Sequence, residues 1–338
     1  MKKLKILSLF SGAGGLDLGF RNAGFDITTS NEIDADTFET YRYNFPNTKH
    51  IGGSIIKLQK EELEDYYDGI IGGPPCQSWS EAGRQKGIDD PRGKLFYEYI
   101  RILELIKPKF FLAENVSGIL HKKHQDALQN ITDRFANVGY NVDYKLLDAV
   151  DYNVPQNRKR VFIIGIRNDI EKNFIFPSIS LFKPNKTLKD ALSDLPNPQP
   201  ALEKNKSNFQ NHITDSNQVS NNEFMIGSFS SIFMSRNRVR GWDEPSFTIQ
   251  AGGRHAPLHP NAPKMKKVEK DLFQFCKKNI NKYRRLSVRE CARIQTFPDD
   301  FVFFYEQVAD AYKMIGNAVP VKLAEALGVE IKSQLFAS

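Results

Sequence analysis

The sequence has few cysteines, no long apolar run and no low-complexity tract, and each absence excludes a class of protein. The three cysteines, Cys76, Cys276 and Cys291, are too few and too scattered for a disulfide framework or a CxxC metal site. The six histidines show no metal-ligand spacing, so we predict no metal. No apolar stretch approaches the ~18–20 residues of a membrane-spanning helix, and the basic start MKKLKILSLF has no cleavage-like site after it. We therefore expect a cytoplasmic protein without a membrane segment.

The composition is that of a globular chain with a small excess of positive charge. The 338 residues are enough for one large or two modest domains, and the 40% of hydrophobic residues excludes wholesale disorder. Lysine and arginine number 47 against 40 acidic residues, which gives a net charge of +7. A basic balance allows a polyanionic partner such as nucleic acid but does not require one.

Two regions with different sequence character follow each other along the chain. Up to about residue 167, apolar runs of strand length alternate with amphipathic helical stretches, a pattern that indicates βαβ units. We predict an α/β fold with a doubly wound, mostly parallel, Rossmann-like sheet. Near residue 175, prolines and a polar aperiodic stretch begin a smaller irregular domain, and the helical tail is expected to pack back on the first domain. The predicted domains are residues 1–174 plus 308–338, and residues 175–307.

The segment FSGAGGL, residues 10–16, lies between a predicted strand and a predicted helix. Glycines at such a turn allow a ligand to approach the backbone at a helix N-terminus. Glu32 ends the next strand, where a carboxylate can bind ribose hydroxyls. A glycine turn alone is weak evidence, but the turn, its setting and the acid together favour a nucleoside-containing cofactor. The absence of a GKT or GKS motif argues against phosphoryl transfer from ATP.

Three further segments place reactive side chains after predicted strands. In GGPPCQ two prolines force a rigid, extended exit that presents Cys76 at the carboxyl end of the sheet, which favours a nucleophile over a small buried cysteine. Glu114 and Asn115 follow the strand KPKFFLA, where Glu114 is a candidate acid rather than only a helix cap. In QNRKR, Arg158 and Arg160 share one face of an extended segment and suit a phosphate or a base carbonyl, although such runs are often solvated edges.

These segments, together with RRLSVRECARIQTFPDDF and IGNAVP, occur in the same order in the C5-cytosine DNA methyltransferases, and the sequence resembles that family over nearly its whole length. The segment SRNRVRGWDEPSFTIQAGGR also resembles the recognition region of bacterial type II restriction-modification enzymes that modify GGCC. One position departs from the pattern: the family often has Gly-Asp-Ile where this chain has Gly53-Ser54-Ile55. An uncharged Ser54 would weaken or move a contact with the adenine amino group.

The resemblance implies S-adenosylmethionine as cofactor and transfer of its methyl group to C5 of cytosine. It implies that the Cys76 thiolate attacks C6 of a flipped-out base, Glu114 acts at N3 and Arg160 at O2, and Asn115 and Arg158 support the loop geometry. The cofactor residues that it implies are Phe10, Ser11, Gly12, Gly14, Gly15, Leu16, Glu32, Ile33, Ser54, Ile55, Pro74, Asn317 and Val319.

The implied partner is double-stranded DNA, with the inner cytosine of GGCC as target, a monomeric enzyme, and a restriction endonuclease against which the methylation protects. Arg236, Arg238 and Arg254 are the predicted guanine readers, because Arg236 and Arg238 point the same way on an extended segment and an arginine fork matches guanine. We assign Arg240 to phosphate or structure. The alternative is that all four only neutralise phosphates.

Three other functions remain open at this point. A branch of the same family modifies tRNA, but the Arg-rich segment between QNRKR and RRLSV favours duplex DNA. A catalytically inactive DNA-binding relative is disfavoured by the intact Cys76, Glu114 and Arg160. An NAD-dependent oxidoreductase would use the glycine turn and leave the Pro-Pro-Cys segment and the arginine motifs without a role.

Overall fold

The computed structural model describes residues 3–75, 95–179, 186–208 and 219–337. The chain forms two compact units. Unit 1 contains Met1–Asp148, Lys159–Leu181 and Leu323–Ser338, and unit 2 contains Ala149–Arg158 and Phe182–Lys322. Among the described residues no helix is both long and apolar enough to cross a membrane.

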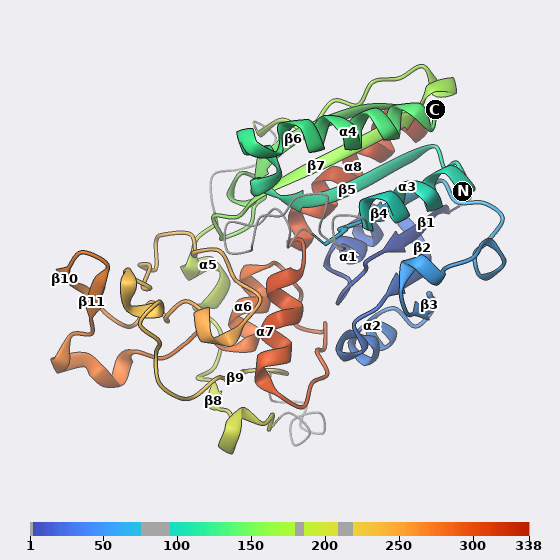
Figure 1. The fold of residues 1–338 in the computed structure, drawn as a ribbon. Coiled ribbons are helices and arrows are strands. Elements are labelled where there is room, and N and C mark those ends of the chain that lie inside the picture. The colour runs from blue at the N-terminus through green and yellow to red at the C-terminus, as the bar shows by residue number, and fades with distance from the viewer. Residues whose placement is uncertain (1–2, 76–94, 180–185, 209–218, 338) are drawn as a thin grey trace. The chain divides into compact units, whose positions relative to one another are not determined.

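The core of unit 1 is a seven-stranded sheet with the strand order β3-β2-β1-β4-β5-β7-β6 (Figure 1). Its strands are β1 (Leu4–Leu9), β2 (Phe25–Glu32), β3 (Lys49–Gly52), β4 (Gly69–Gly72), β5 (Phe110–Val116), β6 (Tyr140–Asp148) and β7 (Lys159–Arg167). The first five strands are parallel where they pair, whereas β7 runs antiparallel to both β5 and β6. The prediction of a doubly wound, mostly parallel sheet is confirmed.

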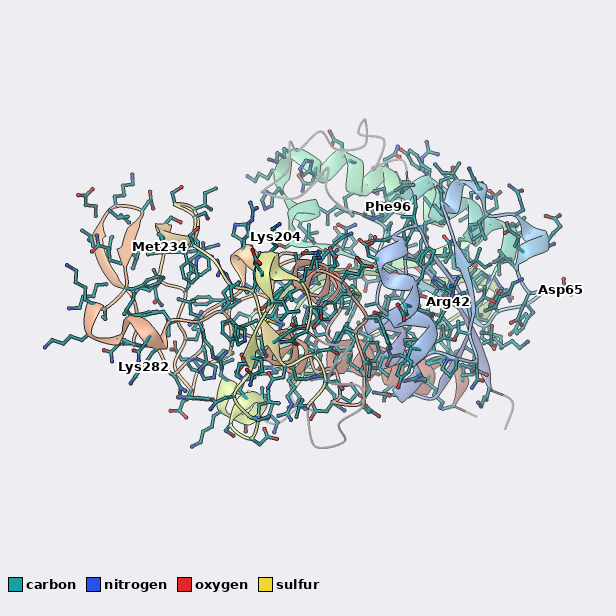
Figure 2. All side chains as sticks on the ribbon, turned by 90° about the horizontal axis from the view of Figure 1, so that it is seen from below. Arg42, Asp65, Phe96, Lys204, Met234 and Lys282 are labelled. Atoms are coloured by element: carbon teal, nitrogen blue, oxygen red, sulfur yellow. The ribbon has the colours of Figure 1, made fainter. Side chains whose placement is uncertain are left out.

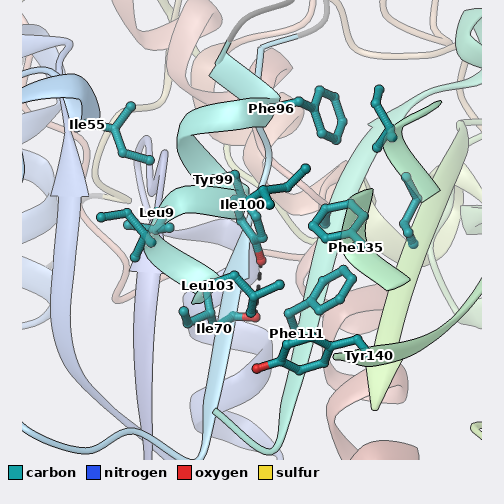
Figure 3. Close-up of a cluster of buried hydrophobic side chains, with 14 of the residues drawn as sticks. Leu9, Ile55, Ile70, Phe96, Tyr99, Ile100, Leu103, Phe111, Phe135 and Tyr140 are labelled. Carbon is teal, nitrogen blue, oxygen red and sulfur yellow. Dashed lines mark hydrogen bonds between the residues drawn. The ribbon is translucent and has the colours of Figure 1, made fainter. Parts of the chain in front are cut away.

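Helices cover both faces of this sheet because successive strand residues point to opposite sides. They are α1 (Gly15–Asn22), α2 (Phe38–Asn44), α3 (Leu95–Ile106), α4 (Gln125–Asn137) and the larger part of α8 (Val321–Phe336). On β5, Phe111 stacks on Phe135 of α4 with ring centroids 4.2 Å apart, in the cluster of Figure 3. Its neighbour Phe110 instead packs against Phe20 of α1 and Phe336 of α8. Each such buried ring contributes about 1.5–3 kcal/mol through removal of apolar surface from water.

The C-terminal helix returns to the start of unit 1, as its apolar sequence predicts. Lys332 donates from Nζ to the carbonyl of Ala23 at 3.1 Å, directly after α1. Gly328 lies so close to α1 that an added Cβ would be 2.8 Å from the Cβ of Ala23. A glycine is therefore required at this helix crossing.

Unit 2 has little regular structure. It contains the short helices α5 (Leu188–Leu192), α6 (Val288–Ile294) and α7 (Val308–Asn317), and the strands β8 (Gln199–Pro200), β9 (Glu223–Phe224), β10 (Lys266–Glu269) and β11 (Leu272–Gln274). A small apolar cluster includes Phe233, Leu258 and Tyr283. The predicted second domain was residues 175–307, but residues 149–158 and 308–322 also belong to unit 2. Residues 308–322 belong there because α7 packs against α6.

Buried arginines take the place of strand ladders in unit 2. Arg158 donates to the carbonyls of Ile249, Gly316 and Ala318. Three further buried guanidinium groups bind backbone carbonyls in the same way, those of Arg238, Arg285 and Arg289. An irregular chain leaves its carbonyl groups without ladder partners, and the five N–H donors of a guanidinium group satisfy several of them at once.

Candidate active site

The glycine turn joins β1 to α1 through a backbone that requires small residues. Phe10, Gly12 and Gly14 have φ values of 56°, 52° and 89°. A Cβ on Gly14 would lie 2.4 Å from the Phe45 ring, which excludes any larger side chain there. A Cβ on Gly12 would have no atom of the described residues within 4 Å, so among these residues this side of the turn is open to a ligand.

Glu32 connects the end of β2 to this turn. Its Oε2 accepts a hydrogen bond from the backbone N–H of Gly12 at 2.8 Å, and its Oε1 accepts from the N–H groups of Ile33 and Asp34 at the same distance. The side chain of Ile33 is 65% exposed directly beside this buried carboxylate. An anchored acid next to an exposed aliphatic side chain is suited to the ribose and base of a nucleoside.

Two further features of this edge fit a bound nucleoside cofactor. The Oγ of Ser11 is buried and has no hydrogen-bond partner among the described residues, so a polar ligand can supply one. Gly53 has φ +131° and open space where a Cβ would lie, and its N–H donates to the carbonyl of Glu32 at 2.7 Å. Ser54 accepts from the N–H of Ile56 at 3.3 Å and caps the 3₁₀ turn that begins at the buried Ile55.

Sequence analysis missed a buried carboxylate that supports this turn from within the unit. Asp17 of α1 is fully buried and accepts hydrogen bonds from the hydroxyls of Ser8 and Tyr41, both at 2.6 Å. Burial raises the pKa of Asp17 to about 6, although both hydrogen bonds oppose the shift. Tyr41 stacks on Phe45, the ring against Gly14. The available signal was an acidic residue within the otherwise apolar stretch LDLGF.

Glu114 and Arg160 form an ion pair at the carboxyl end of β5. Arg160 Nε lies 2.9 Å from Glu114 Oε1, and both side chains are largely buried. Because β7 is antiparallel to β5, its first residues meet the last residues of β5. Glu114 is paired in register with Phe162, two positions beyond Arg160, so both charged side chains lie on one face of the sheet. The structure thus brings two of the predicted catalytic residues together.

Asn115 joins this pair to the end of β4. It is 1% exposed, donates from Nδ2 to the carbonyl of Pro74 at 3.3 Å, and accepts from the N–H of Val116 at 2.9 Å. A Cβ on Gly73 would lie 3.1 Å from Glu114 Oε2, so the Gly-Gly-Pro-Pro segment runs close to the carboxylate. Cys76, the predicted nucleophile, lies outside the described residues.

The predicted pairing of Arg158 with Arg160 as one anion site is wrong. The guanidinium of Arg158 is 1% exposed and donates to three carbonyls within unit 2, between 2.8 and 3.0 Å. The alternation of side chains along an extended segment predicts that Arg158 and Arg160 point to the same side. It does not predict which acceptors the N–H groups of each guanidinium bind. Arg158 supports backbone within unit 2, and the support of the loop geometry that the family resemblance implied for it stays a prediction.

The prediction that Arg236 and Arg238 form a parallel pair of guanine contacts also needs correction. Arg238 is 6% exposed, donates to the carbonyls of Ile232 and Phe233, and lies over the Phe233 ring. Burial and the nearby Arg236 lower the pKa of Arg238 to about 10. Arg236 and Arg254 are exposed. Arg240, which was assigned to phosphate or structure, binds Glu244 at 3.1 Å and lies over Phe247, so its contacts within unit 2 are structural.

A cavity of about 130 Å³ in unit 2 lies beside Arg236. Thr248, Gln250 and His255 line it as well, none of which sequence analysis singled out. The Oγ1 of Thr248 donates to the carbonyl of Asn157 at 2.6 Å, and burial together with the neighbouring arginines lowers the pKa of His255. At neutral pH His255 is therefore uncharged and can both donate and accept a hydrogen bond.

Two predicted cofactor residues belong to unit 2. Asn317 is exposed at the end of α7, and Val319 is 5% exposed just beyond it. Gly316 packs closely against the backbone of Gln250 and Ala251. A Cβ at this position would lie 2.3 Å from Gln250 and 2.4 Å from Ala251, so a larger residue would clash. The role of Asn317 and Val319 in cofactor binding stays a prediction.

The sheet order and the glycine turn define a class, the S-adenosylmethionine-dependent methyltransferases. A solved structure described as a prophage-encoded DNA modification methyltransferase of Escherichia coli matches 99% of this chain and 100% of its own, with TM-score 0.74 and 26% identity. Residues 4–333 match the C-5 cytosine-specific DNA methylase family, and the chain belongs to that family. It is an S-adenosylmethionine-dependent DNA (cytosine-5) methyltransferase.

Curated relatives are similar over almost their full length. Type II methyltransferase M.FnuDI of Fusobacterium nucleatum is 55% identical over 98% of this chain and 95% of its own. Type II methyltransferase M.NgoPII of Neisseria gonorrhoeae is 53% identical over 98% and 96%. The chain is thus similar to enzymes of restriction-modification systems throughout both units.

Proposed function

We propose that the protein methylates the inner cytosine of GGCC in duplex DNA and protects that site from a cognate restriction endonuclease. The observation that carries the proposed chemistry is the Glu114–Arg160 ion pair at the edge of the sheet, next to the segment that leads to Cys76. The resemblance of residues 235–254 to GGCC-modifying enzymes and the type II names of the relatives support the choice of site.

The proposed mechanism uses groups at the ends of β4, β5 and the start of β7. S-adenosylmethionine supplies a methyl group on a cationic sulfur when it is bound. The Cys76 thiolate forms a bond to C6 of a flipped-out cytosine, and the electron pair of the C5–C6 double bond moves toward C5. A proton shared between Glu114 and N3 holds the base, and Arg160 binds O2, where negative charge develops. C5 would take the methyl group as its bond to the cofactor sulfur breaks, and loss of the C5 proton to a base would then re-form the double bond and expel the Cys76 thiolate.

The ion pair between Glu114 and Arg160 orients both side chains for the proposed contacts with the base. Each group keeps the other oriented, and the guanidinium group has further N–H donors for the cytosine oxygen. Asn115 holds the carbonyl of Pro74 and so restrains the segment that carries Cys76. These residues position the ring of the base rather than supply the nucleophile.

The proposed cofactor site lies at the carboxyl ends of β1, β2 and β3. Its polar part consists of the open side of Gly12, the anchored carboxylate of Glu32, and the buried hydroxyl of Ser11, which has no partner among the described residues. Exposed Ile33 is its apolar part, suited to the face of the adenine ring. The other proposed members are Phe10, Gly14, Gly15, Leu16, Ser54, Ile55, Pro74, Asn317 and Val319.

In the proposed DNA interface, Arg236 and Arg254 read guanines, and Arg238 shapes the segment that carries Arg236. The first two have exposed side chains, whereas the donors of Arg238 are used by carbonyl groups. Polar groups that line the cavity beside Arg236, those of Gln250 and His255, extend this interface. An arginine fork on guanine O6 and N7 gives about 1–3 kcal/mol of discrimination.

The test is bisulfite sequencing of DNA treated with the protein and S-adenosylmethionine, which reports the modified atom and its sequence context together. We expect conversion-resistant inner cytosines at GGCC. Cys76→Ser should abolish transfer and leave cofactor binding intact, since an alkoxide is far less available at neutral pH than a thiolate. The half-buried Cys276 provides the matched control, and Cys276→Ser should remain active.

A second measurement tests the covalent step directly. DNA that carries 5-fluorocytosine at the target cannot lose a C5 proton, so the wild-type protein should become covalently trapped and Cys76→Ser should not. Absence of the adduct, or substantial turnover by Cys76→Ser, would refute the assignment of Cys76. Transfer to tRNA but not to DNA would refute the proposed substrate.

A further inference from the structure

Most of the net positive charge of the chain lies in one short segment of unit 2. Residues 264–282 contain seven lysines, no arginine and only two acids, Glu269 and Asp271. This segment therefore has a net charge of +5 out of +7 for the whole chain. All seven lysines are exposed.

The segment folds as an antiparallel hairpin, β10 and β11, followed by a 3₁₀ helix, Lys277–Lys282. Phe275 stacks on Tyr283 at 4.4 Å between ring centroids, and Phe273 and Phe275 pack against the apolar cluster of unit 2. Aromatic residues thus anchor one side of a segment whose lysines extend into solvent. Within unit 2 the hairpin lies at the outer end, away from α6 and α7, and Lys282 is labelled near it in Figure 2.

Six of these lysines form no ion pair with any residue that the structure describes, and they are named the lysine ridge: Lys266, Lys267, Lys270, Lys277, Lys278 and Lys282. The seventh, Lys264, binds Glu244 at 3.2 Å. Arginines of the same unit behave differently, since several are buried against carbonyl groups and others bind acids. The ridge is thus a concentration of like charge, with Glu269 and Asp271 as the only acids of its own segment.

We propose that the lysine ridge binds backbone phosphates of duplex DNA outside the base pairs that Arg236 and Arg254 read. Lysine is a mobile point charge without the planar fork that matches guanine, so it suits phosphate oxygens rather than base edges. Charge complementarity with the DNA substrate of this family favours DNA over other polyanions. The ridge supplies sequence-independent affinity, and this assignment rests on the proposed action on duplex DNA.

Substitution of ridge lysines should change the salt dependence of DNA binding and leave the sequence preference unchanged. Each phosphate contact that is lost lowers the slope of log K against log salt by about 0.9, so Lys277→Gln with Lys278→Gln should lower it by about 2. The loss should be equal on a duplex with one GGCC site and on a scrambled duplex. The ratio of methylation rates on GGCC and on its single-substitution variants should remain that of the wild type.

The matched control is Lys186→Gln with Lys189→Gln, a pair of exposed lysines at α5 in the same unit. It removes the same charge, so an equal slope change in the control would overturn the proposal. An unchanged slope in the ridge variant would overturn it as well, provided that thermal unfolding is that of the wild type. Slope changes on tRNA but not on DNA would assign the ridge to RNA.

The two proposals fail in different ways. If the wild-type protein methylates no GGCC site, the proposed function fails, while binding to the scrambled duplex still measures the ridge. If methylation at GGCC is normal and the ridge variant binds both duplexes with the wild-type slope, only the ridge assignment fails. If the salt slope of the ridge variant changed on the GGCC duplex but not on the scrambled duplex, the lysines would contact bases. That result would also overturn the assignment of the ridge to backbone phosphates.

Discussion

The two units of this protein satisfy their buried backbone carbonyl groups by different means. In unit 1, parallel and antiparallel ladders pair the carbonyls of seven strands. In unit 2, where strands are two to four residues long, donors to the carbonyls come from the guanidinium groups of Arg158, Arg238, Arg285 and Arg289. Arginines in an irregular unit can therefore stabilise its backbone, so a high arginine content does not by itself indicate a nucleic-acid surface.

The same contrast separates lysine from arginine in this chain. Arginines bind carbonyl groups in unit 2 and the carboxylate of Glu114 in unit 1, whereas the lysines of residues 264–282 remain exposed. Arginine is less strongly hydrated and presents its donors in a fixed plane, so its burial is less costly than that of an ammonium group. Exposure thus distinguishes structural cations from candidate DNA contacts.

The largest expected effect concerns the charged pair of unit 1. Glu114→Gln keeps the shape of the side chain but removes the ion pair with Arg160 and the group that holds a proton at N3, and it should lower kcat by about 10²–10³. Initial rates at saturating DNA and cofactor measure this loss. The control is Glu98→Gln, which breaks the Glu98–Arg101 pair on α3 and should keep wild-type activity. A Glu114→Gln rate within tenfold of wild type would contradict the assignment.

A comparison of Arg158 with Arg160 tests whether the first residue mainly stabilises unit 2 and the second mainly supports activity in unit 1. Arg158→Ala leaves three buried carbonyls without their charged donor and should lower the free energy of unfolding by about 3–4 kcal/mol. Arg160→Ala should abolish most activity at a smaller cost in stability, because the Arg160 side chain is 16% exposed whereas Arg158 is 1% exposed. Urea unfolding and initial rates measured on both variants give the two losses. Equal stability losses would remove the distinction.

The buried acid of α1 should give a stability that depends on pH. Because burial raises the pKa of Asp17 from 3.8 to about 6, the folded state binds its proton more tightly than the unfolded state. The contribution of Asp17 to stability is therefore largest below about pH 4 and declines by about 2–3 kcal/mol as pH rises through 6. Asp17→Asn should remove this decline, whereas the exposed Asp133→Asn should not. Parallel pH profiles of wild type and Asp17→Asn would disprove the effect.

The smallest expected effects separate Arg236 from Arg238. Arg236→Ala should relax discrimination at one base pair by about 1–3 kcal/mol, which methylation rates on GGCC and its single-substitution variants report. Arg238→Ala should mainly lower stability, by about 2 kcal/mol, because it removes two hydrogen bonds to carbonyls. A stable Arg238→Ala variant with relaxed specificity would restore the original interpretation of this residue as a base contact.

Sequence periodicity predicted unit 1 better than unit 2. The alternation of strands and helices is a property of each segment, since side chains repeat every 2.0 or 3.6 residues, and the sheet followed from it. The glycine turn was predicted from glycines that lie between a strand and a helix, and the structure gives Gly12 and Gly14 positive φ values of 52° and 89°. In unit 2 no such period exists, and neither the place of α7 nor the burial of Arg238 could be inferred from neighbouring residues.

By itself the sequence determined the α/β class, the order of the motifs and the family, because each depends on short segments read in order. Only the tertiary structure decided that β7 runs antiparallel to β5 and so brings Arg160 to Glu114. It also decided that Asp17 is buried between Ser8 and Tyr41, and that the donors of Arg158 and Arg238 are occupied by carbonyl groups. These contacts join residues that are distant in the chain or lie in irregular segments, so their partners depend on how the whole unit packs rather than on local pattern.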